Sequence, residues 1–175
     1  MRSVIAAAIG VLFVGVLPAR ADQRAWVEMT GAGAQARVET TDAHCPSAEL
    51  DGRSIPMQLR AGPDAAFPVT MCQLDIPANV RRASVGNQTL PLPHGPPQRI
   101  LIFGDTGCRL KGPAIQDCND PKAWPFPTVV RRALERKPDL VIHVGDYYYR
   151  ETPCPEGHVG CAGSPYGDAW ATWKA

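Results

Sequence analysis

Two aspartates in this chain each follow a glycine at the end of an apolar run. Asp105 comes after the run at 100–103, and Asp146 repeats the arrangement 41 positions later, after the run at 141–144. In parallel α/β sheets, ligands bind in the crevice beyond the carboxyl ends of the strands, so the two carboxylates should share one crevice. Crowded carboxylates raise each other's pKa unless a cation neutralises them. The matched pair therefore predicts a metal site.

A glycine-rich turn of this kind can also have a structural or a phosphate-binding role. A single strand-end aspartate often forms a turn or caps a helix, and this stays the alternative for either acid taken alone. A phosphate-binding loop is the second alternative, but GDTGCRLKG has neither the G-x-x-x-x-G-K-[ST] nor the G-x-G-x-x-G spacing. In the metal-site interpretation, Gly104 and Gly145 let the backbone turn sharply, and Gly107 leaves room for a ligand beside the acid.

The residues around the two aspartates predict one βαβ unit. Residues 99–103 and 139–144 are apolar strands, and 127–138 carry apolar and basic side chains on opposite sides of a helix that ends at Pro138. The crossover makes the two strands parallel and buried on both faces.

The residues before this unit predict a small all-β sandwich. Short β-rich segments follow one another, with hairpin turns expected at Asp51-Gly52 and Gly86-Asn87, and no helical periodicity interrupts them. These segments are 25–29, 35–40, 48–59, 68–76 and 82–92. Residues 91–98 are rich in proline and glycine and are interpreted as the linker, with the domain boundary at 94.

Residues 1–21 have the three parts of a secretory signal peptide. Arg2 is followed by an apolar run from Val4 to Leu17 and by the small residues of Ala19-Arg20-Ala21, which predicts cleavage before Asp22. The run is shorter than the roughly 20 residues that a membrane anchor needs, so no stable membrane insertion is expected after cleavage. The chain is expected to be periplasmic or secreted.

The charge balance excludes a nucleic-acid or polybasic membrane-binding surface. Without residues 1–21, 16 of the 18 basic side chains remain against 17 acidic ones, and no basic cluster builds a strong positive field. The 154 remaining residues suit one ordinary domain or two small ones.

Six cysteines follow the signal peptide, and an even count in an exported chain predicts disulfides. Six cysteines allow 15 pairings, so sequence does not fix the connectivity. A zinc site is the alternative, but no C-x-x-C pair or suitably spaced histidine pair is present. Proximity in sequence favours Cys45–Cys72, Cys108–Cys118 and Cys154–Cys161.

The segments 104–107 (Gly-Asp-Thr-Gly) and 145–149 (Gly-Asp-Tyr-Tyr-Tyr) resemble the first two sequence blocks of the calcineurin-like metallophosphoesterases. Their form is that of the purple acid phosphatase branch, Gly-Asp-x-Gly and then Gly-Asp-x-x-Tyr. Most of the superfamily has Asp-x-His in the first block, and Gly107 replaces that histidine here. The resemblance implies that 95–175 are the N-terminal part of an α/β metallophosphoesterase domain of the α-β-β-α type. An immunoglobulin- or fibronectin-like sandwich would precede it in 22–94.

The resemblance also implies a site and a reaction. Asp105 would bind Fe(III), Asp146 would bridge it to a divalent Fe, Zn or Mn ion, and Tyr149 would bind the iron as phenolate, because a trivalent cation lowers the phenol pKa far below about 10. Two metals about 3.5–4 Å apart activate a hydroxide for attack on phosphorus. The implied partner is a phosphoester substrate, and the oligomeric state is left open.

Further candidate residues receive structural interpretations. His143 lies inside an apolar strand and is expected to be buried or to support the site rather than to be a ligand. His158 is expected to be an exposed loop histidine, with a substrate-facing role as the alternative. Asp168 is expected to cap a helix that packs Trp170 and Trp173 on one face.

The 175 residues lack the later blocks of the family pattern, Gly-Asn-His-Glu (or Asp) and Gly-His-x-His. The chain is therefore expected to be a fragment or a truncated product, inactive or nearly so, with no catalytic residue assignable. The sequence favours an exported metal-dependent phosphoester hydrolase, represented by its first part. The alternative is a non-catalytic exported β-sandwich binding module with a degenerate metallophosphoesterase remnant.

Overall fold

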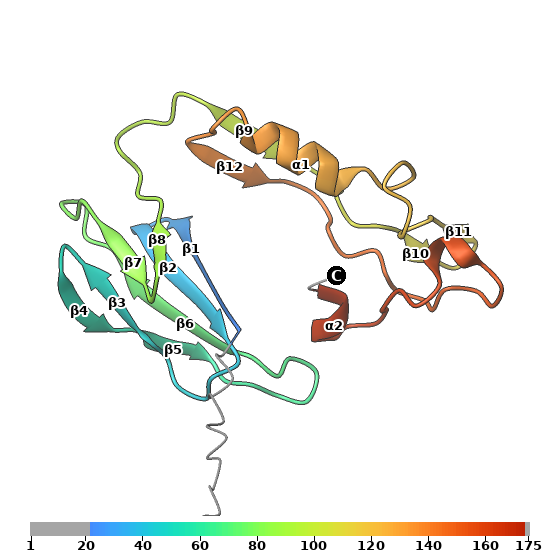
Figure 1. The fold of residues 1–175 in the computed structure, drawn as a ribbon, viewed down its shortest axis with the longest axis horizontal. Coiled ribbons are helices and arrows are strands. Elements are labelled where there is room, and N and C mark those ends of the chain that lie inside the picture. Colours follow the sequence, from blue (N-terminus) through green and yellow to red (C-terminus); the bar gives the residue numbers. More distant parts are fainter. Residues whose placement is uncertain (1–21, 174–175) are drawn as a thin grey trace, which may run out of the picture.

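The computed structural model describes residues 22–173 and is mostly β. It has antiparallel sheets, few helices and one short parallel pair, and its larger part is sandwich-like (Figure 1). The predicted signal peptide lies outside the described residues. Within residues 22–173, none of the helices has the length and apolar character needed to cross a bilayer.

Two four-stranded antiparallel sheets form the first part of the molecule. In spatial order, the first sheet contains β1 (Gln23–Thr30), β2 (Gly33–Thr40), β6 (Thr70–Asp75) and β5 (Gln58–Ala61). The second contains β4 (Arg53–Pro56), β3 (Ser47–Leu50), β7 (Ala83–Val85) and β8 (Gln88–Leu90).

Both predicted hairpin turns are confirmed. Leu50 pairs with Arg53 across Asp51-Gly52, and Val85 pairs with Gln88 across Gly86-Asn87. Asp51 has a φ of 49° and Gly52 a φ of 84°, and positive φ at both central residues is the signature of the tight turn that matches strand twist.

The core of this part lies between the two sheets and is built by strand alternation. The apolar side chains of alternate residues point inward, so both sheets contribute to one buried cluster. Its buried members are Ala25, Ala36, Val38, Ala48, Leu50, Met57, Cys72, Ile76, Ala83, Val85 and Leu90. The disulfide between Cys45 and Cys72 links the segment before β3 to the centre of the first sheet.

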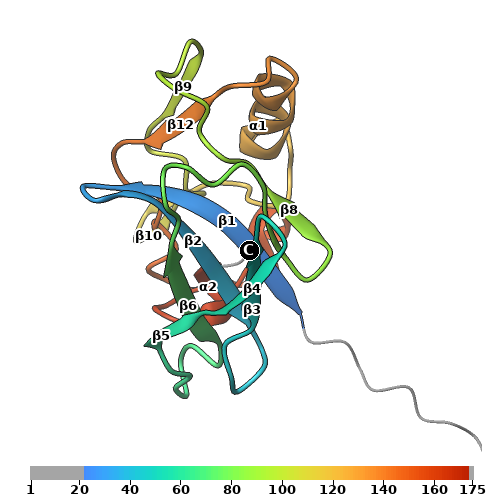
Figure 2. The same ribbon diagram turned by 90° about the vertical axis from the view of Figure 1, so that its left-hand side faces the viewer.

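The predicted βαβ unit is present. β9 (Ile100–Phe103) and β12 (Leu140–His143) pair in parallel, with Ile102 opposite Ile142, and α1 (Phe126–Leu134) lies in the crossover. Figures 1 and 2 show these elements as a separate group beyond the two sandwich sheets.

The helix ends earlier than the sequence predicted. Its last residue is Leu134, and Lys137 adopts a φ of +50° directly before Pro138. Proline disfavours helical backbone in the residue before it, so the chain leaves the helix ahead of the proline.

The expectation that both strands are buried on both faces is wrong for the described residues. Ile102 is 61% exposed, and Val141 is 48% exposed. The reason is that the parallel sheet has two strands, and α1 has no buried residue. Phe126 meets Phe103 edge to face at 5.5 Å between ring centroids, which is one of the contacts that attach α1 to the sheet.

Short elements with a small core of their own complete the second part. They are β10 (Leu110–Lys111), β11 (Ala114–Ile115), the 3-10 turn η1 (Val159–Cys161) and α2 (Trp170–Trp173). Two disulfides, Cys108–Cys118 and Cys154–Cys161, pack in this small core with buried Leu110 and cross-link the segments that form it.

α2 contacts the sandwich. The Trp170 backbone N–H donates to the Ala66 carbonyl at 2.8 Å, and Trp173 meets Phe67 at 6.2 Å between ring centroids. Asp168 lies two residues before the first helical residue, and its carboxylate accepts a hydrogen bond from the Trp173 indole at 2.8 Å. The expected position of Asp168 directly before the helix is therefore wrong, because Ala169 lies between them.

The Asp139 side chain, just before β12, forms hydrogen bonds to the backbone just before β9. Its Oδ2 accepts the backbone N–H groups of Arg99 at 2.9 Å and Gln98 at 3.0 Å, and these bonds hold the carboxyl pKa below its ordinary value. A lowered folded-state pKa contributes stability above the unfolded pKa of about 3.9 and loses it as pH falls through the folded value.

Asp139→Asn is therefore expected to weaken the β9–β12 pair at neutral pH and to remove part of its acid sensitivity. The measurement is amide hydrogen exchange in β9 and β12 between about pH 6 and pH 3. Asp42→Asn, in the sandwich part, is the control. Identical pH profiles for wild type and Asp139→Asn would contradict the assignment.

Candidate metal centre

The parallel register brings the two Gly-Asp segments to one edge of the sheet. Phe103 and His143, the last residues of β9 and β12, lie opposite each other. Pairing continues past the strands, because the Val144 N–H donates to the Phe103 carbonyl at 2.7 Å and the Thr106 N–H donates to the Asp146 carbonyl at 3.0 Å.

The glycines permit close approach of the two segments. Gly145 has a φ of +87°, and a Cβ there would lie 3.0 Å from Oδ2 of Asp105. A Cβ on Gly107 would collide with the carbonyl of Tyr147. On the side where a Cβ would stand, Gly107 therefore faces the backbone of the second segment, so a side chain at this position would separate the two segments.

Asp105 and Tyr149 are in direct contact. The Tyr149 hydroxyl donates to Oδ1 of Asp105 at 2.5 Å. This hydrogen bond, followed by one from the Asp146 backbone, lowers the pKa of the Asp105 carboxyl. The same Tyr149–Asp105 bond raises the pKa of Tyr149, desolvation and the charges of Asp105 and Asp146 raise it further, and a hydrogen bond from Arg109 acts in the opposite direction. Asp105 is thus held as an anion with a phenol proton directed at it.

These residues open onto a pocket of about 390 Å³. Asp105 and Tyr149 line it together with both residues of β11. The lining residues are Asp105, Gly107, Arg109, Ala114, Ile115, Gln116 and Tyr149. Asp146 is not among them, although its backbone carbonyl accepts the Thr106 N–H next to Asp105.

The donor chemistry fits a hard cation. Carboxylate and phenol oxygens are hard donors, and those of Asp105 and Tyr149 meet here, with the Asp146 carboxylate near enough for its charge to act on Tyr149. Among residues 22–173, no three or more His, Cys, Asp or Glu side chains gather in a geometry that could hold a metal ion. Among the described residues, one carboxylate and one phenol oxygen therefore meet here, which is fewer donors than a complete metal site has.

His143 is exposed rather than buried, and it contacts Thr106 and Tyr147. Its Nε2 lies 2.8 Å from the Thr106 hydroxyl, and its ring meets the edge of Tyr147 at 5.6 Å. The contact with Thr106 was not anticipated from the sequence, since 37 residues separate the two and no local pattern links them.

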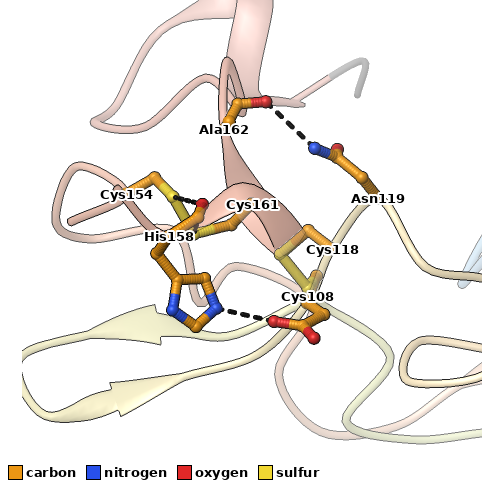
Figure 3. A network of polar contacts seen from close by, with 8 residues as sticks. Cys108, Cys118, Asn119, Cys154, His158, Cys161 and Ala162 are labelled. Atoms are coloured by element: carbon orange, nitrogen blue, oxygen red, sulfur yellow. Dashed lines mark hydrogen bonds and ion pairs between the residues drawn. A yellow bond between two sulfur atoms is a disulfide. The ribbon is translucent and has the colours of Figure 1, made fainter. Parts of the chain in front are cut away.

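His158 belongs to a disulfide-braced network (Figure 3). Its Nε2 lies 2.6 Å from Oδ1 of Asp117, between the Cys108–Cys118 and Cys154–Cys161 disulfides. The Asn119 amide donates to the Ala162 carbonyl at 2.9 Å in the same network. His158 is half-exposed and paired, which corrects the expectation of an exposed loop histidine.

All three predicted disulfides are confirmed, and no described cysteine is free. They indicate an oxidising, extracytoplasmic environment. Comparisons with protein-family models, with curated proteins and with solved structures give no match.

Proposed function

We propose that this chain carries the first part of the metal centre of an exported phosphoester hydrolase, of the purple-acid-phosphatase-like branch of the calcineurin-like metallophosphoesterases. The observation that supports it best is the meeting of the Asp105 carboxylate and the Tyr149 hydroxyl at the carboxyl ends of the parallel strands. If Asp105 served only to form a turn, its carboxylate would not need the hydrogen bond from the Tyr149 hydroxyl.

Asp105, Asp146 and Tyr149 are the proposed ligands of Fe(III) and of a divalent Fe, Zn or Mn ion. Such a metal pair supplies a hydroxide nucleophile and neutralises charge on the phosphoryl oxygens. Asp105 is kept ionised by the Tyr149 hydroxyl and the Asp146 N–H, so it offers an anionic oxygen without prior proton loss. The hydroxyl proton of Tyr149, now held against Oδ1 of Asp105, has to leave before the phenol oxygen can bind a cation.

The surrounding organisation is part of the proposal. Residues 22–94 are an immunoglobulin- or fibronectin-like domain, 95–175 begin the catalytic domain, and the protein acts in the periplasm or outside the cell on a phosphoester. The second candidate function, a non-catalytic exported binding module, is favoured by one observation. It is the lack of three clustered His, Cys, Asp or Glu ligands in residues 22–173.

The test of function is hydrolysis of an aryl phosphate by the natural gene product purified from its host. Metal-dependent hydrolysis that a chelator abolishes and added metal restores is the expected result. Full-length product that binds no metal and hydrolyses no phosphoester would favour the binding module.

Tyr149→Phe is expected to remove the visible absorption of the iron-loaded protein, because that band requires a phenolate–iron bond. The ring remains, so Arg109, whose guanidinium carbon lies 4.8 Å from the ring centroid, keeps its packing partner. The absorption spectrum after Fe(III) loading is the measurement, and Tyr166→Phe is the matched control. An unchanged band in Tyr149→Phe would exclude this tyrosine as a ligand.

A further inference from the structure

Arg109 is the cationic side chain of the pocket beside Asp105 and Tyr149. The remaining lining residues are one acid, one phenol, one amide and three small or aliphatic residues. Arg109 was not anticipated from the sequence as a site residue, although it follows the Gly-Asp-Thr-Gly segment by two positions.

The backbone of Arg109 is fixed on both sides. Its N–H donates to Oε1 of Gln116 at 3.1 Å, and its carbonyl accepts the Gln116 N–H at 2.9 Å. The flanking residues Cys108 and Leu110 are 1% and 0% exposed, and Cys108 is bonded to Cys118. The backbone at Arg109 is therefore held in place by its neighbours.

The side chain lines the pocket and interacts there with Tyr149. Its guanidinium carbon lies 4.8 Å from the centroid of the Tyr149 ring, a stacking contact that restricts the side chain. Within residues 22–173, no carboxylate forms an ion pair with it. A guanidinium has five N–H donors in a planar fork that matches the oxygens of a phosphate.

We propose that Arg109 binds the phosphoryl oxygens of a phosphate monoester in this pocket, next to Asp105. The inference rests on the proposed function, because it places the substrate's phosphoryl group beside the proposed metal ligands. A braced and stacked arginine loses little side-chain freedom when it binds, which favours charge-assisted hydrogen bonds to an anion. Ala114 and Ile115 form an apolar wall for the organic part of the ester.

The probe is inorganic phosphate, titrated by calorimetry into the exported protein in its metal-free and metal-loaded forms. Arg109→Gln keeps length and polarity but removes the charge, and it is expected to weaken phosphate binding on the order of 10–100-fold in both forms. Arg109→Lys keeps the charge without the planar fork of donors, and its affinity for phosphate should lie between those of wild type and Arg109→Gln. Arg131→Gln, on α1, is the control and should bind phosphate as wild type does.

The outcomes separate this inference from the proposed function. Unchanged metal content with weakened phosphate binding in Arg109→Gln supports both. Equal phosphate affinity in wild type and Arg109→Gln, or no phosphate binding by wild type, overturns the role of Arg109. A wild-type protein that takes up no metal yet binds phosphate through Arg109 overturns the proposed hydrolase and leaves the anion site standing. Intact disulfides, shown by the absence of free thiols, verify that the variants are folded.

Discussion

Replacing Asp146 with asparagine is expected to abolish metal binding while the fold survives. The substitution keeps the shape of the side chain and removes its charge, and the backbone carbonyl that accepts the Thr106 N–H is unaffected. Changes in the groups that merely orient metal ligands already cost about 10–100-fold in affinity, so loss of a bridging ligand should cost at least that. The measurement is metal content by elemental analysis, beside circular dichroism as a check of folding.

Asp105→Asn makes the matched comparison. Asp105 has a φ of +51°, and asparagine tolerates this left-handed region better than most residues, so the change should add little backbone strain. Loss of the Asp105 charge should weaken chiefly the first metal. If both acids are only turn formers, either asparagine variant should keep the wild-type metal content, because asparagine serves in turns and caps about as well as aspartate.

Removing the Cys45–Cys72 disulfide is expected to cause the largest loss of stability. The bond joins residues 27 positions apart, and Cys72 is fully buried in the sandwich core. By the chain-entropy relation, closing a loop of this length is worth about 3–4 kcal/mol, a large fraction of the roughly 5–15 kcal/mol of a typical domain. Urea unfolding of the Cys45→Ala, Cys72→Ala double variant measures it.

The Cys154–Cys161 pair supplies the control for this prediction. It spans 7 positions, for which the same relation gives about 2–3 kcal/mol. It lies in the small core of the second part, so its loss should leave the sandwich transition in place. Equal unfolding midpoints for wild type and the Cys45→Ala, Cys72→Ala variant would show that this bridge does not constrain the unfolded chain.

Much of the fold follows from short-range sequence signals. Asp51-Gly52 forms its turn because both positions accept positive φ, and α1 ends ahead of Pro138 because the ring disfavours helix before it. Asp105 and Asp146 come to one edge because a crossover connection makes β9 and β12 parallel. In each case the local structure is determined by a few neighbouring residues or by one connection.

The remaining features depend on which distant residues meet. Apolar strands predict burial, but burial needs a covering layer, and α1 alone leaves Ile102 exposed. The contact of His158 with Asp117 spans 41 positions and follows from the two disulfides around it. Gln116 and Tyr149 hold Arg109 in the pocket, and no periodic pattern in the sequence predicts either contact.

The central claim is that Asp105, Asp146 and Tyr149 together bind metal. The most direct measurement loads the exported protein with Fe(III) and Zn²⁺, removes unbound ions by gel filtration, and determines the retained metal by elemental analysis. The Asp105→Asn, Asp146→Asn, Tyr149→Phe triple variant is treated in parallel. Retained iron in the wild type and none above background in the triple variant is the expected result. Equal retention by the two proteins, or no retained metal in the wild type, would contradict the account.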